Sequence, residues 1–468
     1  MSISISMFFE QLKDKNVFFI GMGVTNFGII KQFQQKGIAV TVCDKKSEKE
    51  LSNIYPEHYQ TLVDLGVRFI TGLDYMNHFT KADIIYRTPG MNYLTPELTQ
   101  AREQGIVVTS EMETFFELCP CKIYAVTGSD GKSTTTTLIS EMLKAQGKTV
   151  HLGGNIGKAL LPIIETIQPT DVAVVELSSF QLISMRQSPD VAVVTNVAPN
   201  HLDVHKDMKE YIDAKSNLIL HQNAFSKTVL NLDNSITCQM KDLARGQVLY
   251  FSRTQQPTDG AYLSKDGCLY RSCHGQSEYI LPASEIKLPG LHNVENYLAA
   301  ITAVGKEVSI DNIKKVAHTF SGVEHRIEYV RTLDDVRYYN DSIGTSPTRT
   351  IAGLNSFDQK IIVIAGGYDK KIPYEPLAPH INQKVKILIL LGATADKIEK
   401  AVLEEEHYQP QQLQIIRVKT LEEAVQTARE VAVAGDVVML SPASASFDLY
   451  LNFEQRGHHF KRLVNELK

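Results

Sequence analysis

The stretch Ala125-Val-Thr-Gly-Ser-Asp-Gly-Lys-Ser-Thr134 decides the fold of the central part of this chain. It overlaps the apolar run from Ile123 to Val126, which predicts a strand, and it leads into a run that is typical of a helix. A strand, a glycine-rich turn and a Lys-Ser pair form a loop whose backbone N–H groups bind phosphate at a helix N-terminus. We expect Lys132 to reach the β- and γ-phosphates of a nucleotide and the Ser133 hydroxyl to bind Mg²⁺.

This loop is one residue tighter than the common G-x-x-x-x-G-K-[ST] pattern. Val126 stands where the first glycine of that pattern belongs, and Gly128 is the nearer glycine. We therefore expect a variant phosphate loop. The alternative is a plain glycine-containing turn with a solvated lysine.

Length and composition bound the class of protein. A chain of 468 residues suggests about three domains. The net charge of -5 is spread without long runs of one sign, so nothing indicates a surface that binds nucleic acid. The N-terminus lacks a signal-peptide pattern and apolar runs such as 387–391 are too short to span a bilayer, so we expect a cytoplasmic protein without a membrane segment.

The cysteines are too few and too scattered for a disulfide framework. Cys119-Pro-Cys121 and the pair Cys268 and Cys273 leave a zinc site open as an alternative. Neither pair has the C-x₂-C spacing that structural zinc sites use.

The N-terminal part alternates short β-branched runs with helical stretches, which predicts a parallel sheet with crossover helices. The expected strands are 17–20, 39–43, 67–70, 83–86 and 106–108. The first is followed by Gly21-Met-Gly23-Val-Thr-Asn26, and Asp44 closes the second, as in a Rossmann-type nucleotide site. Asn26 replaces the third glycine of this pattern. The alternative interpretation is a turn that only packs a helix on a strand and binds no nucleotide.

The same alternation returns twice. Further strands are expected at 123–126, 149–152, 172–176, 191–194 and 229–231, and then at 361–365, 387–391, 414–418 and 437–440. The stretch 232–289 loses this rhythm and predicts an antiparallel or loop-rich excursion. We therefore predict an α/β chain with a Rossmann-like N-terminal domain (1–111), a P-loop-type central ATPase domain (112–322) and a Rossmann-like C-terminal domain (323–468).

Polar residues at predicted strand ends are the candidates for chemistry, because ligands of open α/β sheets lie outside the carboxyl ends of the strands. Glu176 is a candidate Mg²⁺ ligand, although it could instead cap the following helix. His201 is expected on a loop that faces the same crevice. The spacing His201-x-Asp203-x-His205 also leaves a hydrolytic metal site open.

Three further sets of residues have weaker local signals. Lys215 reads as a lysine on the exposed face of an amphipathic helix. Asn293 and Asn296 are expected on one face at the start of a helix, where they could pair with a base or a carboxylate. Arg326 could reach a nucleotide from an interdomain hinge, but a linker arginine is often only solvated.

Several motifs taken together resemble the Mur ligase family along essentially the whole chain. They are T-G-S-D-G-K-S-T (127–134), G-G-N-I-G (153–157), E-L-S-S-F-Q-L (176–182), N-H-L-D (200–203), A-K (214–215), G-x-H-N (290–293), E-H-R (324–326), N-D-S (340–342), G-G-x-D-K (366–370), S-P-A-S-A-S-F-D (441–448) and N-F-E-Q-R-G (452–457).

This resemblance implies an ADP-forming ligase of peptidoglycan precursor synthesis. It implies the joining of D-glutamate to UDP-N-acetylmuramoyl-L-alanine through an acyl phosphate, with ATP, two Mg²⁺ ions and a monomeric enzyme. The final S-P-A-S-A-S-F-D stretch favours D-glutamate as the added amino acid. Folylpolyglutamate synthase, an NAD(P) oxidoreductase and a regulatory nucleotide-binding module are the alternatives.

The resemblance also assigns site residues. It implies that Lys132, His201 and Lys215 are catalytic, and that metal is held by Ser133, Glu176, His201 and Lys215, the last as a carbamate. The implied ATP residues are Gly128, Ser129, Asp130, Gly131, Lys132, Ser133, Thr134, Asn293, Asn296, Arg326 and Asp341. The implied UDP-substrate residues are Gly23, Val24, Thr25, Asn26, Asp44, Gly90 and Asn155. The implied D-glutamate residues are Thr345, Lys370, Ser446, Phe447 and Phe453.

One position departs from the family pattern. The family usually has N-D-S-K-A-T where this chain has Asn340-Asp-Ser-Ile343-Gly-Thr345, so a lysine is missing beside a site for carboxylates. Ser346-Pro347 predicts a helix start that places Arg349 in the first turn. Arg349, or Lys371 as the second choice, is our candidate for the missing charge; a solvated arginine is the alternative.

Overall fold

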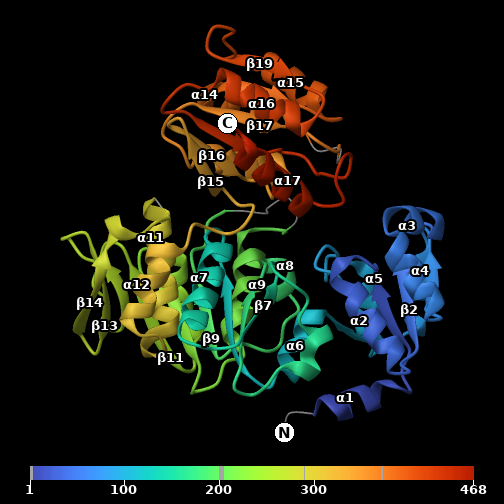
Figure 1. Cartoon of the computed structure of the whole chain (residues 1–468). Helices are drawn as coiled ribbons and strands as arrows, with labels where there is room; N and C mark the ends of the chain where they lie inside the picture. The colour runs from blue at the N-terminus through green and yellow to red at the C-terminus, as the bar shows by residue number, and fades with distance from the viewer. Residues whose placement is uncertain (1–3, 200–204, 289, 370–372) are drawn as a thin grey trace. The chain divides into compact units, whose positions relative to one another are not determined.

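The computed structural model describes residues 4–199, 205–288, 290–369 and 373–468. The chain divides into two compact units, Met1–Thr319 and Phe320–Lys468. The first unit contains a five-stranded and a nine-stranded sheet, and the second contains a six-stranded sheet (Figure 1).

The first sheet has the strand order β3-β2-β1-β4-β5 and is parallel throughout. All five predicted strands are confirmed, as β1 (Val17–Ile20), β2 (Val40–Asp44), β3 (Arg68–Thr71), β4 (Ile84–Tyr86) and β5 (Val107–Thr109). The helices are α1 (Ile5–Leu12), α2 (Val24–Gln35), α3 (Glu48–Ile54), α4 (Pro56–Asp64), α5 (Pro96–Glu103) and α6 (Glu111–Leu118). Because β1 lies between β2 and β4, the loops after β1 and β4 diverge at a topological switch point.

The second sheet has the order β14-β13-β12-β11-β10-β9-β6-β8-β7. Its parallel core contains β6 (Lys122–Thr127), β7 (Val150–Gly154), β8 (Val172–Glu176), β9 (Val191–Val194) and β10 (Lys227–Asn231), as predicted. Every residue of β8 and β9 is buried, which explains their continuous apolar sequences. The helices of this part are α7 (Lys132–Ala145), α8 (Ser179–Leu182), α9 (Met208–Leu220), α10 (Ser235–Gln239), α11 (Leu291–Val304) and α12 (Ile310–Thr319).

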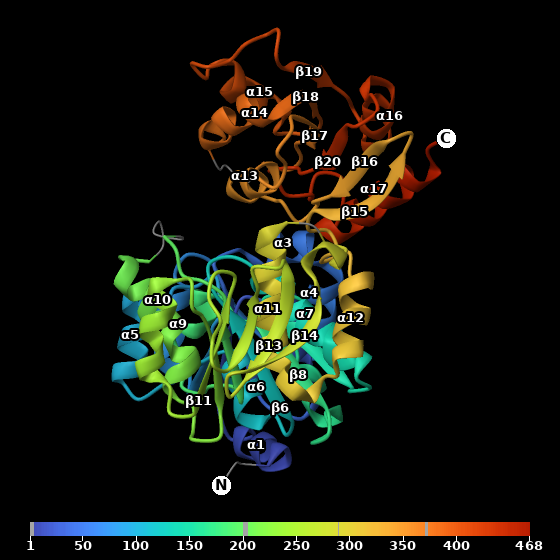
Figure 2. The same ribbon diagram turned by 90° about the vertical axis from the view of Figure 1, so that its left-hand side faces the viewer.

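The predicted antiparallel excursion is confirmed in its second half only. The strands β12 (Gly260–Leu263), β13 (Cys268–Cys273) and β14 (Gln276–Pro282) form an antiparallel meander. The strand β11 (Gln247–Ser252), in contrast, pairs parallel with both β10 and β12 and so extends the core sheet. The helix α11 packs against β11 and β12 and against α7 (Figure 2).

The third sheet has the order β15-β16-β20-β17-β18-β19. The predicted strands are confirmed as β17 (Ile361–Ala365), β18 (Val385–Leu390), β19 (Gln414–Arg417) and β20 (Val437–Leu440), and all of them are parallel. The hairpin of β15 (Glu328–Leu333) and β16 (Val336–Asn340), which we did not predict, adds an antiparallel edge. The helices are α13 (Pro347–Leu354), α14 (Ala378–Lys384), α15 (Ala395–Leu403), α16 (Leu421–Val431) and α17 (Phe453–Glu466).

Two apolar cores cover the two faces of this third sheet. One contains Leu354, Leu388 and Ile398, and the other contains Ile389, Val425 and Phe460. Across the ranges that the structure describes, no helix is both long and apolar enough to cross a membrane.

Candidate active site

The phosphate loop connects the carboxyl end of β6 to the first turn of α7, as the sequence predicts. Gly131 is the N-cap of α7 with φ +76°, and a Cβ at this position would collide with Oδ1 of Asn296. Gly128 also has a positive φ, and a Cβ there would collide with the Thr195 hydroxyl. Both glycines are therefore required by close approach as well as by backbone conformation.

Neighbouring strand ends hold the loop in place. The backbone N–H of Ser129 donates to the Asn196 carbonyl (2.8 Å), and the N–H of Asp130 donates to Oδ1 of Asn196 (2.9 Å). The Thr195 hydroxyl donates to the Asp130 carbonyl (2.6 Å). Since Thr195 and Asn196 directly follow β9, the sheet itself fixes the loop.

Lys132 occupies the first position of α7, and its amine lies over the loop. Its Nζ donates to the carbonyls of Gly128 (3.0 Å) and Ser129 (2.9 Å). Ser133 is buried in the same turn, and Thr134 follows it. A lysine held over a glycine-rich loop at a helix N-terminus is the arrangement that binds the terminal phosphates of a nucleotide.

Glu176 is the last residue of β8 and is buried. Its Oε1 accepts a hydrogen bond from Nδ2 of Asn155 (2.7 Å), while Oε2 is buried without a hydrogen-bond partner. Such an unpartnered carboxylate oxygen is costly to bury unless a ligand completes it. Oxygen ligands of this kind, with the Ser133 hydroxyl nearby in the fold, suit Mg²⁺.

Lys215 is not on an exposed face of its helix, so the amphipathic interpretation is wrong. The side chain lies on α9, is 1% exposed, and donates from Nζ to the Gly128 carbonyl (2.8 Å). Burial lowers the pKa of Lys215 well below its ordinary value, and the positive charge of Lys132 lowers it further. Both effects favour the uncharged amine, the form that can act as a nucleophile, while Glu176 and Asp130 oppose them.

Asn293 and Asn296 share one buried face of α11, as the spacing predicts. Nδ2 of Asn296 donates to Oδ1 of Asn293 (3.2 Å), and Oδ1 of Asn296 accepts from the Thr135 hydroxyl (3.3 Å). Both amides therefore lie beside the N-terminus of α7. This placement brings them to the phosphate loop.

The turn after β1 brings Asp44 and the loop after β4 together. Asn26 is buried and its Nδ2 donates to the carbonyls of Ile20 (3.0 Å) and Gly21 (3.1 Å), so its amide stabilises the turn where a third glycine is absent. Gly21 lies between the side chains of Asp44 and Thr88. Thr88 is two residues before Gly90 in the loop after β4. Gly23 is the N-cap of α2; the side chains of the next two residues, Val24 and Thr25, are outside the described part.

In the second unit, Asp341 follows β16 and is fully buried. Burial raises its pKa to about 6, although the Ser441 hydroxyl donates to Oδ2 (2.7 Å) and Arg326 and Arg349 oppose the rise. Ser446 is buried, whereas Phe447 is exposed and makes an edge contact with Tyr368. Thr345 lies in the turn before α13.

Arg349 lies in the first turn of α13, which starts after Ser346 with Pro347 as predicted. The Ser346 side chain makes no capping hydrogen bond, however. The Arg349 side chain is exposed. Phe453 is the first residue of α17, and its carbonyl accepts from the Ser342 hydroxyl (2.7 Å).

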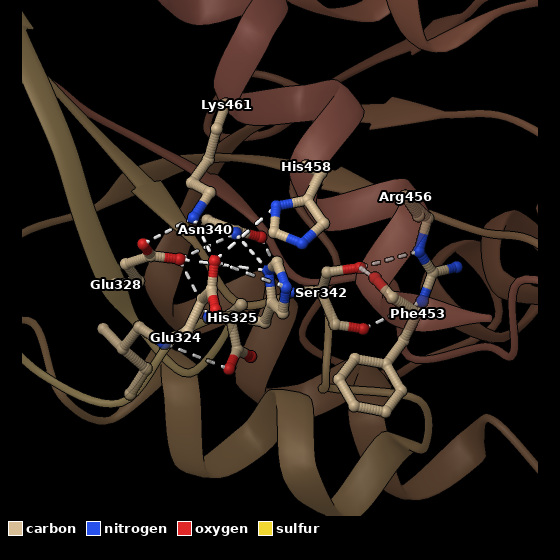
Figure 3. A network of polar contacts seen from close by, with 11 residues as sticks. Glu324, His325, Glu328, Asn340, Ser342, Phe453, Arg456, His458 and Lys461 are labelled. Carbon is tan, nitrogen blue, oxygen red and sulfur yellow. Dashed lines mark hydrogen bonds and ion pairs between the residues drawn. The ribbon is translucent and has the colours of Figure 1, made fainter. Parts of the chain in front are cut away.

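Arg456 is a residue of this region that the sequence analysis missed. Its buried guanidinium donates to the Ser342 carbonyl (2.9 Å), the Ala445 carbonyl (3.1 Å) and the Ser444 carbonyl (3.2 Å), as Figure 3 shows in part. It therefore joins the N-D-S turn to the S-A-S loop. The sequence feature that could have identified Arg456 is its position within the motif N-F-E-Q-R-G.

A polar network at the start of the second unit surrounds His325 (Figure 3). Lys461 forms ion pairs with Glu324 (2.7 Å) and Glu328 (2.9 Å), and Nδ2 of Asn340 donates to Nδ1 of His325 (2.9 Å). Burial lowers the pKa of His325, so the neutral ring carries its proton on Nε2. That proton and the Lys461 cation disfavour a metal ion at Glu324, His325 and His458, although their ligand atoms lie within 4.8 Å of one another.

Arg87 was also missed, and it joins the two sheets of the first unit. It follows β4 directly, is buried, and donates to the Phe180 carbonyl (2.8 Å) and the Ser184 hydroxyl (2.6 Å) of the α8 region. The Ser184 hydroxyl in turn donates to Glu113 (3.0 Å). The only feature of the sequence that could have identified Arg87 is its position directly after a predicted strand.

Some predicted residues cannot be placed. His201, Asp203, Lys370 and Lys371 lie outside the described residues. His205, the third residue of the alternative hydrolytic motif, is buried and lies within hydrogen-bonding distance of Glu210 (3.0 Å) and Ser179 (2.8 Å).

Three family models match the chain in series. They are the Mur ligase MurD-like N-terminal domain over residues 15–110, the Mur ligase middle domain over residues 126–304, and the Mur ligase glutamate ligase domain over residues 325–444.

Full-length relatives agree with these family matches. The chain is 51% identical over 470 aligned positions to a UDP-N-acetylmuramoylalanine--D-glutamate ligase from Acetivibrio thermocellus, and 46% identical over 467 to one from Clostridium botulinum, each covering both chains completely. Among solved structures, UDP-N-acetylmuramate-alanine ligase from Thermotoga maritima matches with a TM-score of 0.56 at 16% identity, covering 97% of this chain and 100% of that one. At that identity the structural match concerns the fold alone.

Proposed function

The chain belongs to the Mur ligase family, and on that premise we propose that it joins D-glutamate to UDP-N-acetylmuramoyl-L-alanine in peptidoglycan precursor synthesis, with ATP converted to ADP and phosphate. The observation that carries the chemistry is the convergence of Lys132, Glu176 and Lys215 on the phosphate loop. The choice of D-glutamate rests on the full-length relatives.

The reaction needs activation because a carboxylate is a poor acylating agent. Transfer of the γ-phosphoryl group of ATP to the alanine carboxylate gives an acyl phosphate. The amine of D-glutamate then attacks its carbonyl carbon, and phosphate departs from a tetrahedral intermediate. Lys132 stabilises charge on the transferring group, in the position that the loop carbonyls give it.

We propose that Ser133, Glu176 and His201 hold Mg²⁺, which would neutralise phosphate charge. The unpartnered Oε2 of Glu176 supports this assignment. The buried amine of Lys215, whose lowered pKa favours the uncharged form, supports a carbamate: its nitrogen attacks the carbon of CO₂, the new C–N bond forms, and a proton leaves. The resulting anion would suit a second Mg²⁺ ion.

The remaining assignments rest on the resemblance of the chain's motifs to those of the Mur ligase family. We propose that the loops after β1, β2 and β4 bind the UDP moiety with Gly23, Val24, Thr25, Asn26, Asp44 and Gly90, and that Asn155 contacts the muramoyl group. We assign ATP contacts to the loop residues with Asn293, Asn296, Arg326 and Asp341. D-glutamate is assigned to Thr345, Lys370, Ser446, Phe447 and Phe453.

We propose domain limits of 1–111, 112–322 and 323–468; the three sheets and the three matched regions support this division. We further propose a monomeric enzyme in the cytoplasm, the compartment that supplies ATP and the UDP-linked substrate.

The test is phosphate release from the full chain. We expect release only when ATP, UDP-N-acetylmuramoyl-L-alanine and D-glutamate are all present, with a product heavier by one glutamyl residue. L-glutamate is the matched control and should give little release. Release without the muramoyl substrate, or hydride transfer to NAD(P), would contradict the proposal.

A further inference from the structure

Cys119 and Cys121 lie in the connection between the first two sheets, apart from the residues assigned to catalysis. Cys119 is the C-cap of α6, Pro120 follows, and Cys121 directly precedes β6. The two Sγ atoms are 3.5 Å apart. The phosphate loop is at the opposite end of β6, so this pair is not part of the nucleotide site.

Local structure holds the two sulfur atoms together. The backbone N–H of Cys119 donates to the Phe115 carbonyl (2.8 Å), which fixes the end of the helix, and the ring of Pro120 restricts the one intervening residue. Cys121 is 6% exposed within the apolar core, while Cys119 is half-buried at its edge. A disulfide needs the sulfur atoms about 2 Å apart, so a further approach of the two Sγ atoms would be required to close the bond.

The two thiols are electronically unequal. Its side-chain contact with Cys119 lowers the pKa of Cys121; burial opposes this, and a backbone hydrogen bond from Ala173 lowers the pKa further. The same contact, with burial, raises the pKa of Cys119. Thiolate is the nucleophilic form of cysteine, so the direction of these shifts favours Cys121 as the attacking sulfur and Cys119 as the resolving one.

We propose that Cys119 and Cys121 form a reversible dithiol–disulfide site that hydroperoxides oxidise and small dithiols reduce. The Cys121 thiolate attacks one peroxide oxygen, the O–O bond breaks, and the departing hydroxide takes up a proton and leaves as water. The Cys119 sulfur then attacks the Cys121 sulfenic acid, forming S–S and breaking S–O. The Cys119 proton leaves with hydroxide as a second water, so one H₂O₂ accepts two electrons from the two sulfurs.

The other cysteines provide an internal contrast. Burial, followed by the charge of Asp44, raises the pKa of Cys43 to about 12, so its thiol is unreactive. Cys268 and Cys273 are the two ends of the extended strand β13, about 16 Å apart at the usual rise of a strand. They cannot close a disulfide while β13 is intact, and this makes them the matched control pair.

The test starts with the reduced, folded full chain and a small excess of H₂O₂, followed by thiol titration and peptide mapping. We expect the thiol count to fall from six to four, with a loss of two hydrogens in the peptide that contains Cys119 and Cys121. Dithiothreitol should restore both thiols. Unchanged thiols at this pair, or equal oxidation of Cys268 and Cys273, would overturn the proposal.

Two single variants test the roles within the pair. In Cys119→Ser, dimedone should trap a sulfenic acid on Cys121, and in Cys121→Ser the yield on Cys119 should be at least about fivefold lower, in line with the difference in thiolate character. The reverse order would overturn the assignment of Cys121. A urea-unfolded sample is the last control: if it forms the disulfide as fast as the folded chain, the fold does not create the site. None of these measurements depends on ligase activity, so this inference and the proposed function fail independently.

Discussion

Lys215 illustrates at the residue scale how tertiary contacts change the chemistry of one side chain. On α9 it is simply a lysine of a helix with an apolar face, but the fold buries its amine against the Gly128 carbonyl and near Lys132. Burial and a neighbouring cation both disfavour the ammonium form. The shift favours the uncharged amine, which is the species that reacts with CO₂.

Replacing Lys215 with alanine should therefore remove an anion rather than a cation. We expect Lys215→Ala to lose at least about a hundredfold in turnover, as typically follows loss of one preorganised electrostatic group. Acetate or another short-chain carboxylate should restore part of it. The measurement is phosphate release with and without the added carboxylate, and full activity in the alanine variant would contradict the role.

Lys132→Ala tests the phosphate loop directly. Lys132 is half-buried, and its Nζ donates to the loop carbonyls of Gly128 and Ser129. We expect a folded protein, by circular dichroism, whose phosphate release falls by about a thousandfold or more. Turnover close to that of the unaltered chain would reject the loop as the ATP site.

Arg349 tests how the chain compensates for Ile343. If Arg349 contacts a D-glutamate carboxylate, losing a charge-assisted hydrogen bond worth about 1.5–3 kcal/mol should raise the KM for D-glutamate by about tenfold or more in Arg349→Ala. Adding Ile343→Lys to that variant should lower the KM again. An unchanged KM in Arg349→Ala would return this arginine to an ordinary surface position.

At the scale of elements, α6 carries two carboxyl groups in its first turn, those of the buried Glu111 and the half-buried Glu113. Oε1 of Glu111 accepts backbone hydrogen bonds from Leu160 and Leu161 (both 2.9 Å), and Glu113 accepts from Ser184 (3.0 Å). Burial raises the pKa of each to about 7, despite these hydrogen bonds. Acidic side chains favour a helix N-terminus, so the sequence explains the helix but not the burial.

These pKa values predict how stability depends on pH. A carboxyl group whose pKa is higher in the folded chain binds more protons there, so stability falls as pH rises from about 4.5 to about 7. For Glu111 the difference amounts to on the order of 3 kcal/mol. Glu111→Gln keeps an acceptor for Leu160 and Leu161, and thermal unfolding followed from pH 5 to 8 should show a flatter decline. An unaltered pH profile would contradict the raised pKa.

At the scale of the whole molecule, the chain forms two compact units, of which the second has its own complete sheet with an apolar core on each face. A unit of that size with two covered faces can fold by itself. We expect the fragment 320–468 to unfold cooperatively on heating, monitored by circular dichroism. A fragment that stays unfolded, with the full chain stable under the same conditions, would contradict independent folding.

The sequence by itself determined most of the fold and located the candidate phosphate loop. The alternation of buried apolar runs with helices identified the parallel strands, because a strand covered on both faces must be apolar throughout. The strand–glycine–Lys-Ser pattern located the phosphate loop, since loop conformation there depends on glycines close in sequence. Glu176 and the asparagines of α11 could be identified because their chemistry follows from their place at a strand end or on one helix face.

Only the tertiary structure decided features that depend on residues distant in sequence. Arg87 and Arg456 bind backbone carbonyls of other segments, which no local pattern encodes. The parallel pairing of β11 and the hairpin β15–β16 also depend on which edge of a sheet is free. The burial of Lys215 has the same origin. The sequence of α9 specifies which residues share a face of the helix, but the packing of α9 against β6 decides what that face contacts. Desolvation by this packing then lowers the pKa of the amine.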